Sequence, residues 1–193
     1  MFRAHMQADG STQTKIEFER LYMTHAQAVY QYCARRVATD DAKDATADVF
    51  VVAWRRFDDM PNGEAALPWL YVVARNVLRD RSRSRRRRDR LTAKVASHHE
   101  PSVEGPEPQV VRSSEYEAVI AAMERLSETD REVIRLVEWE GLSREKVAEM
   151  MFVSRAAIDK RMARAYKKLA RILGVKQSDV RTTPVPIEEG GEA

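Results

Sequence analysis

Apolar residues recur at spacings of three and four along two stretches of the chain, which is the pattern of amphipathic α-helices. The first stretch covers residues 15–84, and the second begins near Ser114 and ends before Gly174. Nowhere do apolar and polar residues alternate as they do in a strand, and no internal repeat is present. The pattern predicts an all-α fold with two small helical domains joined by a flexible linker.

Three helices are predicted in the first stretch. The first carries an apolar stripe that runs from Phe18 to Cys33. The second covers residues 40–57, with Thr39 as its N-cap and aspartates in its first turn. A turn-forming Pro-Asn-Gly sequence follows. The third helix covers residues 68–86, because proline is well tolerated in the first turn of a helix.

Serines mark the helix starts of the second stretch. Ser127 is the predicted N-cap of a helix that ends at Gly141, and Asp130 three residues later makes a weak variant of the capping box. Ser143 and Ser154 are predicted to cap a short helix and a longer one. These last two helices are joined by about three residues, so they match a helix-turn-helix.

Composition divides the chain into four parts. Residues 15–88 and 115–174 form the two predicted helical domains. Residues 89–114 lose the helical periodicity and include three prolines, which predicts a linker. Residues 175–193 are polar and rich in proline and glycine, which predicts a disordered tail.

Positive charge is concentrated in patches, although the net charge of the chain is only +3. Residues 79–90 contain eight arginines and no apolar residue. Because this run continues a helix whose first half is apolar, we interpret it as the exposed end of an anchored helix and not as a free tail. A basic patch of this kind is typical of a protein that binds a polyanion.

Cys33 is the only cysteine, which excludes a disulfide within the chain and a multi-cysteine zinc site. The N-terminal residues lack the apolar run of a signal peptide, and no eighteen consecutive residues are apolar. We therefore expect a soluble, cytoplasmic protein. The sequence leaves open whether translation starts at Met1 or at Met6.

Charge is also segregated within the helix-turn-helix. Residues 155–171 contain seven Lys or Arg and one Asp, on the helix that would enter a major groove. An ordinary helical hairpin with a solvated basic face is the alternative. Ala148 is small enough to let the two helices cross closely. Phe152 lies where glycine would tolerate a left-handed backbone, so we expect either a strained turn, costing about 1 kcal/mol or more, or another turn geometry.

Both helical blocks resemble the extracytoplasmic-function (ECF) sigma factors of bacteria. Their C-terminal, promoter-reading domain is similar to REVIRLVEWEGLSREKVAEMMFVSRAAIDKRMARAYKKL, and their N-terminal domain to DAKDATADVFVVAWRRFDDM followed by PWLYVVARNVLRDRSRSRRRR. The resemblance covers about residues 15–88 and 115–173, in the same order and with a linker between them. It implies a factor that docks on core RNA polymerase, recruits it to −35 and −10 elements, helps to open the duplex and is released during elongation.

The resemblance also implies partners and a location. Such factors perform no covalent chemistry, need no cofactor, and are commonly held inactive by an anti-sigma factor. We expect a monomer when the chain is not bound to polymerase, and association with the nucleoid within the holoenzyme.

The family's contacts can be carried onto residues of this chain. The second helix would meet the polymerase clamp, although Ala47 and Asp48 stand where the family usually has Gln and Glu. The polymerase contacts implied are Asp44, Asp48, Val51 and Arg55. The −10 contacts implied are Asn62, Arg75, Asn76, Arg79 and Arg83, with phosphates held by Arg85, Arg86 and the two arginines after them. The −35 contacts implied are Arg155, Ala156, Asp159, Lys160 and Arg161, with Arg164 on the DNA backbone.

Several of these residues have a plainer interpretation. Asn62 is more simply a turn residue than a reader of a flipped base. Trp54, Phe57 and Trp69 could stack on opened bases, but the place of Trp54 and Trp69 on apolar stripes favours the core for these two. Asp159 could accept a hydrogen bond from cytosine, or it could pair with Arg155 four residues earlier.

Other functions have less support in the sequence. An enzyme would need a constellation of catalytic residues, and neither a Gly-rich phosphate loop nor a nucleophile motif is present. His98, His99 and Glu100 are adjacent in the predicted linker and cannot converge on one metal ion without distant help. A helix-turn-helix regulator that binds duplex DNA without polymerase is the main alternative. An RNA-binding adaptor would explain the arginines but not the helix-turn-helix.

Overall fold

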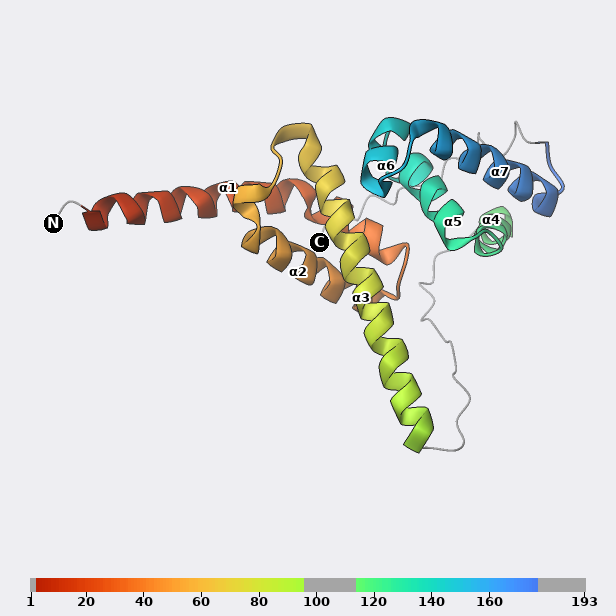
Figure 1. Ribbon diagram of the computed structural model, residues 1–193, viewed down its shortest axis with the longest axis horizontal. Helices are drawn as coiled ribbons and strands as arrows, with labels where there is room; N and C mark the ends of the chain where they lie inside the picture. Colours follow the sequence, from red (N-terminus) through yellow and green to blue (C-terminus); the bar gives the residue numbers. More distant parts are fainter. Residues whose placement is uncertain (1–2, 96–113, 177–193) are drawn as a thin grey trace. The chain divides into compact units, whose positions relative to one another are not determined.

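The computed structural model describes residues 3–95 and 114–176, with side chains over residues 12–90 and 117–176. These residues form helices and no strand, which confirms the all-α prediction (Figure 1). The chain divides into two compact units, Met1–Glu107 and Pro108–Ala193. Most of the predicted linker and nearly all of the predicted tail lie outside the described residues.

Unit 1 is a three-helix domain. Its helices are α1 (Arg3–Ala34), α2 (Thr39–Arg55) and α3 (Ala66–Val95), and two short 3-10 turns, η1 (Phe57–Asp59) and η2 (Gly63–Ala65), connect α2 to α3. Each of the three helices packs against the other two. This mutual packing encloses one hydrophobic core.

The core of unit 1 is built from the apolar stripes read in the sequence. Tyr32 on α1 stacks on Tyr71 on α3, with ring centroids 4.9 Å apart, and this contact anchors the first half of α3. The other buried side chains include Val29, Cys33, Ala45, Val49, Ala53, Leu70 and Ala74.

Two expectations about α2 are wrong. Ala38, not Thr39, is the N-cap of α2, and it offers no side-chain hydrogen bond. Asp40 and Asp41 in the first turn still favour the positive end of the helix dipole. Trp54, which was expected in the core, is 44% exposed because it lies at the edge of unit 1, packed edge-on against Phe18 at 4.9 Å.

Helix α3 is continuous from the core into the arginine run. Its 30 residues span about 45 Å at 1.5 Å per residue. Its first half is buried against α1 and α2, whereas residues 82–90 are exposed. Figure 1 shows this second half extending beyond α2. The helix ends at Val95, so residues 89–95 of the predicted linker are helical.

Unit 2 is organised around one long helix. Its elements are α4 (Ser114–Glu124), α5 (Glu128–Ile134), a π-helical turn η3 (Arg135–Trp139), α6 (Arg144–Met151) and α7 (Arg155–Leu173). Helix α7 packs against α4, α5 and α6. The buried side chains include Val133, Leu136, Val147, Ile158, Met162, Ala165, Tyr166 and Leu169.

The predicted serine caps of unit 2 are confirmed. The hydroxyls of Ser127, Ser143 and Ser154 each accept a hydrogen bond from the backbone N–H three residues later, at 3.1, 3.2 and 3.2 Å. Gly141 and Gly174 adopt positive φ angles of 66° and 69° where helices end. These local signals define where α6 and α7 begin, and so define the helix-turn-helix.

Candidate nucleic-acid and protein interfaces

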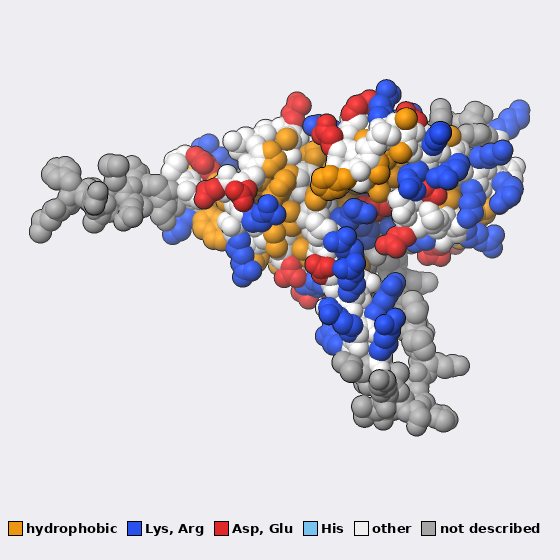
Figure 2. Space-filling model, in the orientation of Figure 1, with side chains coloured by type: hydrophobic (Ala, Val, Ile, Leu, Met, Phe, Trp, Pro, Cys, Tyr) orange, Lys and Arg blue, Asp and Glu red, His pale blue; other side chains and the backbone are white. Residues whose placement is uncertain are grey.

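The arginines of α3 lie on two faces of the helix. Residues advance by about 100° each around an α-helix, so Arg75, Arg79 and Arg83 share one face, whereas Arg81 and Arg85 share the opposite one. Arg81 and Arg85 face α2 and lie over its carboxylates. Figure 2 shows Lys and Arg side chains along the exposed half of α3.

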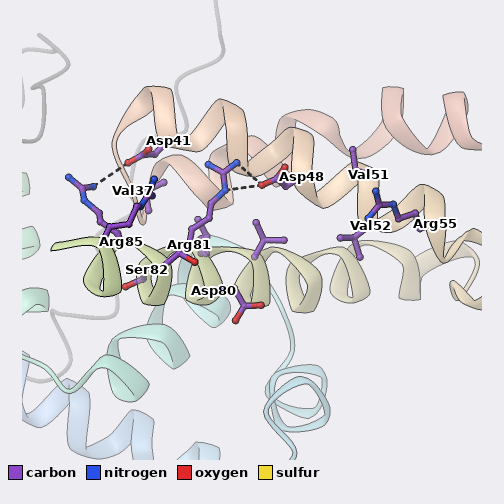
Figure 3. A pocket seen from close by; sticks show the side chains of 14 residues that line it. Val37, Asp41, Asp48, Val51, Val52, Arg55, Asp80, Arg81, Ser82 and Arg85 are labelled. Carbon is purple, nitrogen blue, oxygen red and sulfur yellow. Dashed lines mark hydrogen bonds and ion pairs between the residues drawn. The ribbon is translucent and has the colours of Figure 1, made fainter. Parts of the chain in front are cut away.

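The inner face of α3 is ion-paired with α2. Arg81 donates to Oδ2 of Asp48 from Nε at 2.9 Å and from Nη2 at 2.5 Å. Asp44 lies 3.9 Å from Arg81, and Asp41 lies 3.6 Å from Arg85. Figure 3 shows Arg81 pointing toward Asp48, and Arg85 toward Asp41, across the two helices. Two residues expected to bind polymerase and one expected to bind phosphate are therefore partners within the domain.

Arg81 is a residue that sequence reasoning missed. The sequence did contain a signal: Asp41, Asp44 and Asp48 recur at spacings of three and four on one helix, and Arg81 and Arg85 are four apart on another. What it did not contain is the crossing of α2 and α3, which brings the two sets together.

An open groove runs between α2 and α3, with a volume of about 720 Å³. Charged groups from both helices line it, and Figure 3 shows Val51 and Arg55 on the α2 side. Its apolar lining consists of Val37, Val51, Val52, Val77 and Leu78. Asp44, Asp48, Val51 and Arg55 are all exposed and follow one another at spacings of four, three and four residues. They therefore form one continuous face of α2.

The outer face of α3 is open to a partner. Arg79 donates a hydrogen bond from Nη2 to Oδ1 of Asn76 at 3.1 Å, and both side chains are exposed. Arg83 and Arg86 are also exposed, whereas Arg75 is half-buried. A row of guanidinium groups at this spacing can contact successive phosphates of a nucleic acid backbone.

The loop between α2 and α3 holds Asn62 at the surface. Asn62 occupies the N-cap position of η2, but its side chain makes no capping hydrogen bond. Nearby, the guanidinium of Arg56 lies 5.9 Å from the ring centroid of Trp69, which is half-buried. Phe57 packs edge-on against Phe18 at 5.7 Å. The loop thus exposes Asn62 among other polar side chains, including the carboxylates of Asp58, Asp59 and Glu64.

Ion pairs orient the first turns of α7. Asp159 lies 2.8 Å from Nη1 of Arg144 and 3.9 Å from Nε of Arg155. Arg155 also lies 2.7 Å from Glu145 on α6. The pairing expected between Asp159 and Arg155 is present, and Arg144 is a second partner that the sequence did not indicate. These contacts tie α6 to α7 across the helix-turn-helix.

The other residues of α7 that were predicted to contact the −35 element differ in whether their side chains turn toward the domain or toward solvent. Arg161 lies 3.2 Å from Asp130 on α5 and is 33% exposed, so it turns toward the domain. Arg164, 3.9 Å from the same carboxylate, is 68% exposed. Ala156 and Lys160 are exposed as well. Figure 2 shows Lys and Arg side chains gathered over α7.

Phe152 lies in the turn of the helix-turn-helix and has a left-handed backbone, with φ 54° and ψ 44°. The strained turn is therefore the correct one of the two expectations. The side chain is 90% exposed. No ring contact inside unit 2 offsets this exposure among the aromatic contacts that the described residues make.

Other kinds of site find little support in the described part of the chain. No group of three or more His, Cys, Asp or Glu side chains there could hold a metal ion. Cys33 is buried, and His98, His99 and Glu100 lie outside the described residues. None of the described helices is long and apolar enough to cross a membrane.

Comparison with known proteins identifies the two units. Residues 21–88 match the family model of Sigma-70 region 2, and residues 116–169 match that of Sigma-70, region 4. The RNA polymerase sigma factor NccH of Alcaligenes xylosoxydans xylosoxydans is 33% identical over 165 residues, which cover 83% of this chain and 88% of NccH.

Solved structures agree with this assignment. The structure of CnrH in complex with the cytosolic domain of CnrY has a TM-score of 0.58 and 26% identity, and the match covers 86% of this chain and 94% of CnrH. The sigma factor RpoE of Bartonella quintana, solved with the anti-sigma factor NepR, has a TM-score of 0.63 and the same fold at 22% identity, over 83% of this chain and 98% of RpoE. The chain belongs to the ECF sigma factors, transcription initiation factors that bind core RNA polymerase and direct it to promoters.

Proposed function

We propose that the inner face of α3 supports the polymerase-binding surface of unit 1 and that its outer face binds DNA. The observation that carries this proposal is the separation of the arginines: Arg81 and Arg85 neutralise the carboxylates of α2, while Arg79 and Arg83 point outward. The outer face then holds the −10 region of the promoter through phosphates. The paired inner face holds α2 in place as a platform for polymerase.

On this platform the polymerase contacts are Asp44, Asp48, Val51 and Arg55. Their mixture of carboxylates, one apolar side chain and one guanidinium suits a protein surface better than a phosphate backbone, because the carboxylates would repel phosphate. The groove beside Val51 offers apolar surface that a protein side chain can cover.

For the −10 element, Arg75, Asn76, Arg79 and Arg83 face the duplex, and Arg85 and Arg86 add phosphate contacts. Arg85 must exchange its exposed pair with Asp41 for a phosphate, which costs little because both side chains are solvated. Asn62 binds an unpaired base of the opened strand, since its side chain is exposed and does not cap η2.

For the −35 element, the exposed residues at the start of α7 enter the major groove. Ala156 and Lys160 meet base edges, Arg164 holds a phosphate, and Arg155 contributes from the first turn. Asp159 and Arg161 act as positioning residues, because their partners Arg144 and Asp130 lie within the domain.

The solved relative CnrH binds the cytosolic domain of CnrY. By similarity, we propose that a protein inhibitor, an anti-sigma factor, binds this chain and covers its polymerase and DNA surfaces. The chain itself catalyses no reaction. It is monomeric when not bound to a partner, and it joins the nucleoid in the cytoplasm as part of the holoenzyme.

Run-off transcription with purified core polymerase and genomic fragments tests this function. We expect initiation at discrete sites only when the chain is added, and weak DNA binding by the chain alone. The Arg79→Ala, Arg83→Ala variant should lose promoter opening but keep polymerase binding, whereas Asp48→Lys should lose polymerase binding. Tight, specific DNA binding without polymerase, together with no initiation, would instead identify a helix-turn-helix regulator.

A further inference from the structure

The backbone of Phe152 has a conformation that favours glycine. Its N–H bonds to the carbonyl of Glu149 at 3.2 Å, and the N–H of Val153 bonds to the carbonyl of Ala148 at 3.1 Å. These two bonds form a Schellman motif, whose left-handed position glycine usually occupies. Among the described residues, Phe152 is the only residue other than glycine with a positive φ angle.

The side chain of Phe152 gives the fold no compensating stability. It is 90% exposed, more than any other exposed large apolar side chain in the described residues. Val153 beside it is 38% exposed. Because glycine would relieve the backbone strain without loss of buried area, stability of the domain alone does not explain a phenylalanine at this position.

The position of Phe152 points to DNA as the partner of its ring. It lies two residues before Ser154, the N-cap of α7, so it is continuous with the proposed −35 surface. The carboxylates near the turn are compensated: Glu145 lies 2.7 Å from Arg155, and Glu149 lies 3.2 Å from Lys146. The exposed cations of α7 are Arg155, Lys160, Arg164, Lys167 and Arg171. Phe152 therefore lies three residues before Arg155, directly before the cationic helix that is proposed to enter the major groove.

We propose that Phe152 is a specificity-determining residue of the −35 interface and that its ring contacts the C5-methyl group of a thymine. This methyl group is the one apolar feature that base pairs present in the major groove, and a phenyl ring is among the groups that recognise it. The inference rests on the proposed function of α7 as the −35 reader. It adds a contact from the turn that precedes the helix.

Replacement of single thymines by deoxyuridine tests the contact, because it removes only the methyl group. Holoenzyme formed with the chain and core polymerase is titrated at fixed salt with a promoter fragment on which it initiates. Each thymine of the −35 element, on either strand, is replaced in turn. We expect one replacement to weaken binding about fourfold, the factor for withdrawing one methyl group from water.

Two substitutions of Phe152 distinguish an effect on DNA recognition from an effect on folding. Phe152→Gly should have an unchanged or higher Tm, yet should bind the promoter at least about fourfold more weakly and respond equally to thymine and deoxyuridine. Phe152→Leu keeps an apolar group and should retain a preference for thymine. Met23→Ala, which removes another exposed apolar side chain in unit 1, should leave promoter binding unchanged.

Three results would overturn the proposal. The first is wild-type affinity and thymine dependence in Phe152→Gly. The second is insensitivity of the wild-type holoenzyme to every deoxyuridine. The third is weaker binding of Phe152→Gly to core polymerase, which would assign the ring to a protein contact. Failure of the −35 function of α7 is seen separately, as full promoter affinity in a variant that lacks Lys160 and Arg164.

Discussion

Arg81 on α3 binds the carboxylate of Asp48 on α2 through two nitrogens, although 33 residues separate them in the sequence. The pair lies where the proposed polymerase surface meets the helix that carries the arginines proposed to bind DNA. The contact therefore links the helix of the proposed polymerase surface to the helix whose outer arginines are proposed to bind DNA.

The Arg81–Asp48 pair should contribute modestly to the stability of unit 1. The side chains are 36% and 52% exposed, so solvent screening limits their coupling to about 0.5–1 kcal/mol. A double-mutant cycle with Arg81→Ala and Asp48→Ala, measured by urea unfolding, should give this coupling and a smaller value in high salt. The matched control is Arg85 with Asp41, which are 3.6 Å apart; Arg85 is more exposed than Arg81, so this coupling should be smaller. Equal coupling in the two cycles would contradict the geometry.

The outer arginines should change the salt dependence of promoter binding. Removal of one phosphate contact lowers the magnitude of the slope of log K against log salt by about one. We expect Arg79→Ala and Arg83→Ala each to produce this change in holoenzyme titrations. Arg81→Ala is the control, because its guanidinium faces α2, and it should leave the slope nearly unchanged.

The contribution of the N-cap of α7 to the stability of unit 2 should be measurable by substitution of Ser154 alone. The Ser154 hydroxyl accepts a hydrogen bond from the N–H of Ala157, so Ser154→Ala should destabilise unit 2 by about 1 kcal/mol. Ser154→Gly should cost only a few tenths of a kcal/mol, about 0.3, since glycine is tolerated at this position. Chemical denaturation that follows unit 2 distinguishes the two variants. An alanine variant as stable as the wild type would show that the cap is unimportant.

His25 should make the stability of unit 1 depend on pH. Burial lowers the pKa of His25 from its usual value of 6.5, so the unfolded chain binds the proton first as pH falls. The free energy of unfolding should therefore decrease as pH falls through about 6.5, until the folded state is protonated as well. The difference between wild type and His25→Gln, followed by urea unfolding from pH 7.5 to 5, isolates this contribution. A difference that does not vary with pH would contradict it.

Local signals in the sequence were sufficient where a feature depends on a few adjacent residues. The serine caps are of this kind, because a cap is decided within about four residues. At Phe152 the sequence left two turn geometries open, and the structure has the left-handed one. The prediction that Thr39 caps α2 was wrong, because the N-cap is the residue with extended backbone angles. At α2 that residue is Ala38, with φ −61° and ψ 155°.

Long-range relationships could not be predicted from the sequence. Periodicity placed Trp54 on the apolar face of α2, but it could not show that this end of the helix lies at the edge of the domain. Nor could it show that Asp48 meets Arg81 or that Arg161 turns to Asp130, because both pairs depend on how helices cross. Residue type identified the candidate residues. Only the packing of the helices showed which of them are ion-paired within the domain and which face outward.

The continuity of α3 constrains which changes in chain length this domain can tolerate. An insertion of one residue after Leu78 would rotate every later side chain by about 100° about the helix axis. Arg81 and Arg85 would leave the aspartates of α2, and the outward arginines would leave the face that is proposed to bind DNA. Insertion of seven residues, close to two full turns, would restore the orientation but move the arginines about 10 Å along the axis. Length variation among related chains should therefore be rare between Leu78 and Arg86 and more common beyond Val95.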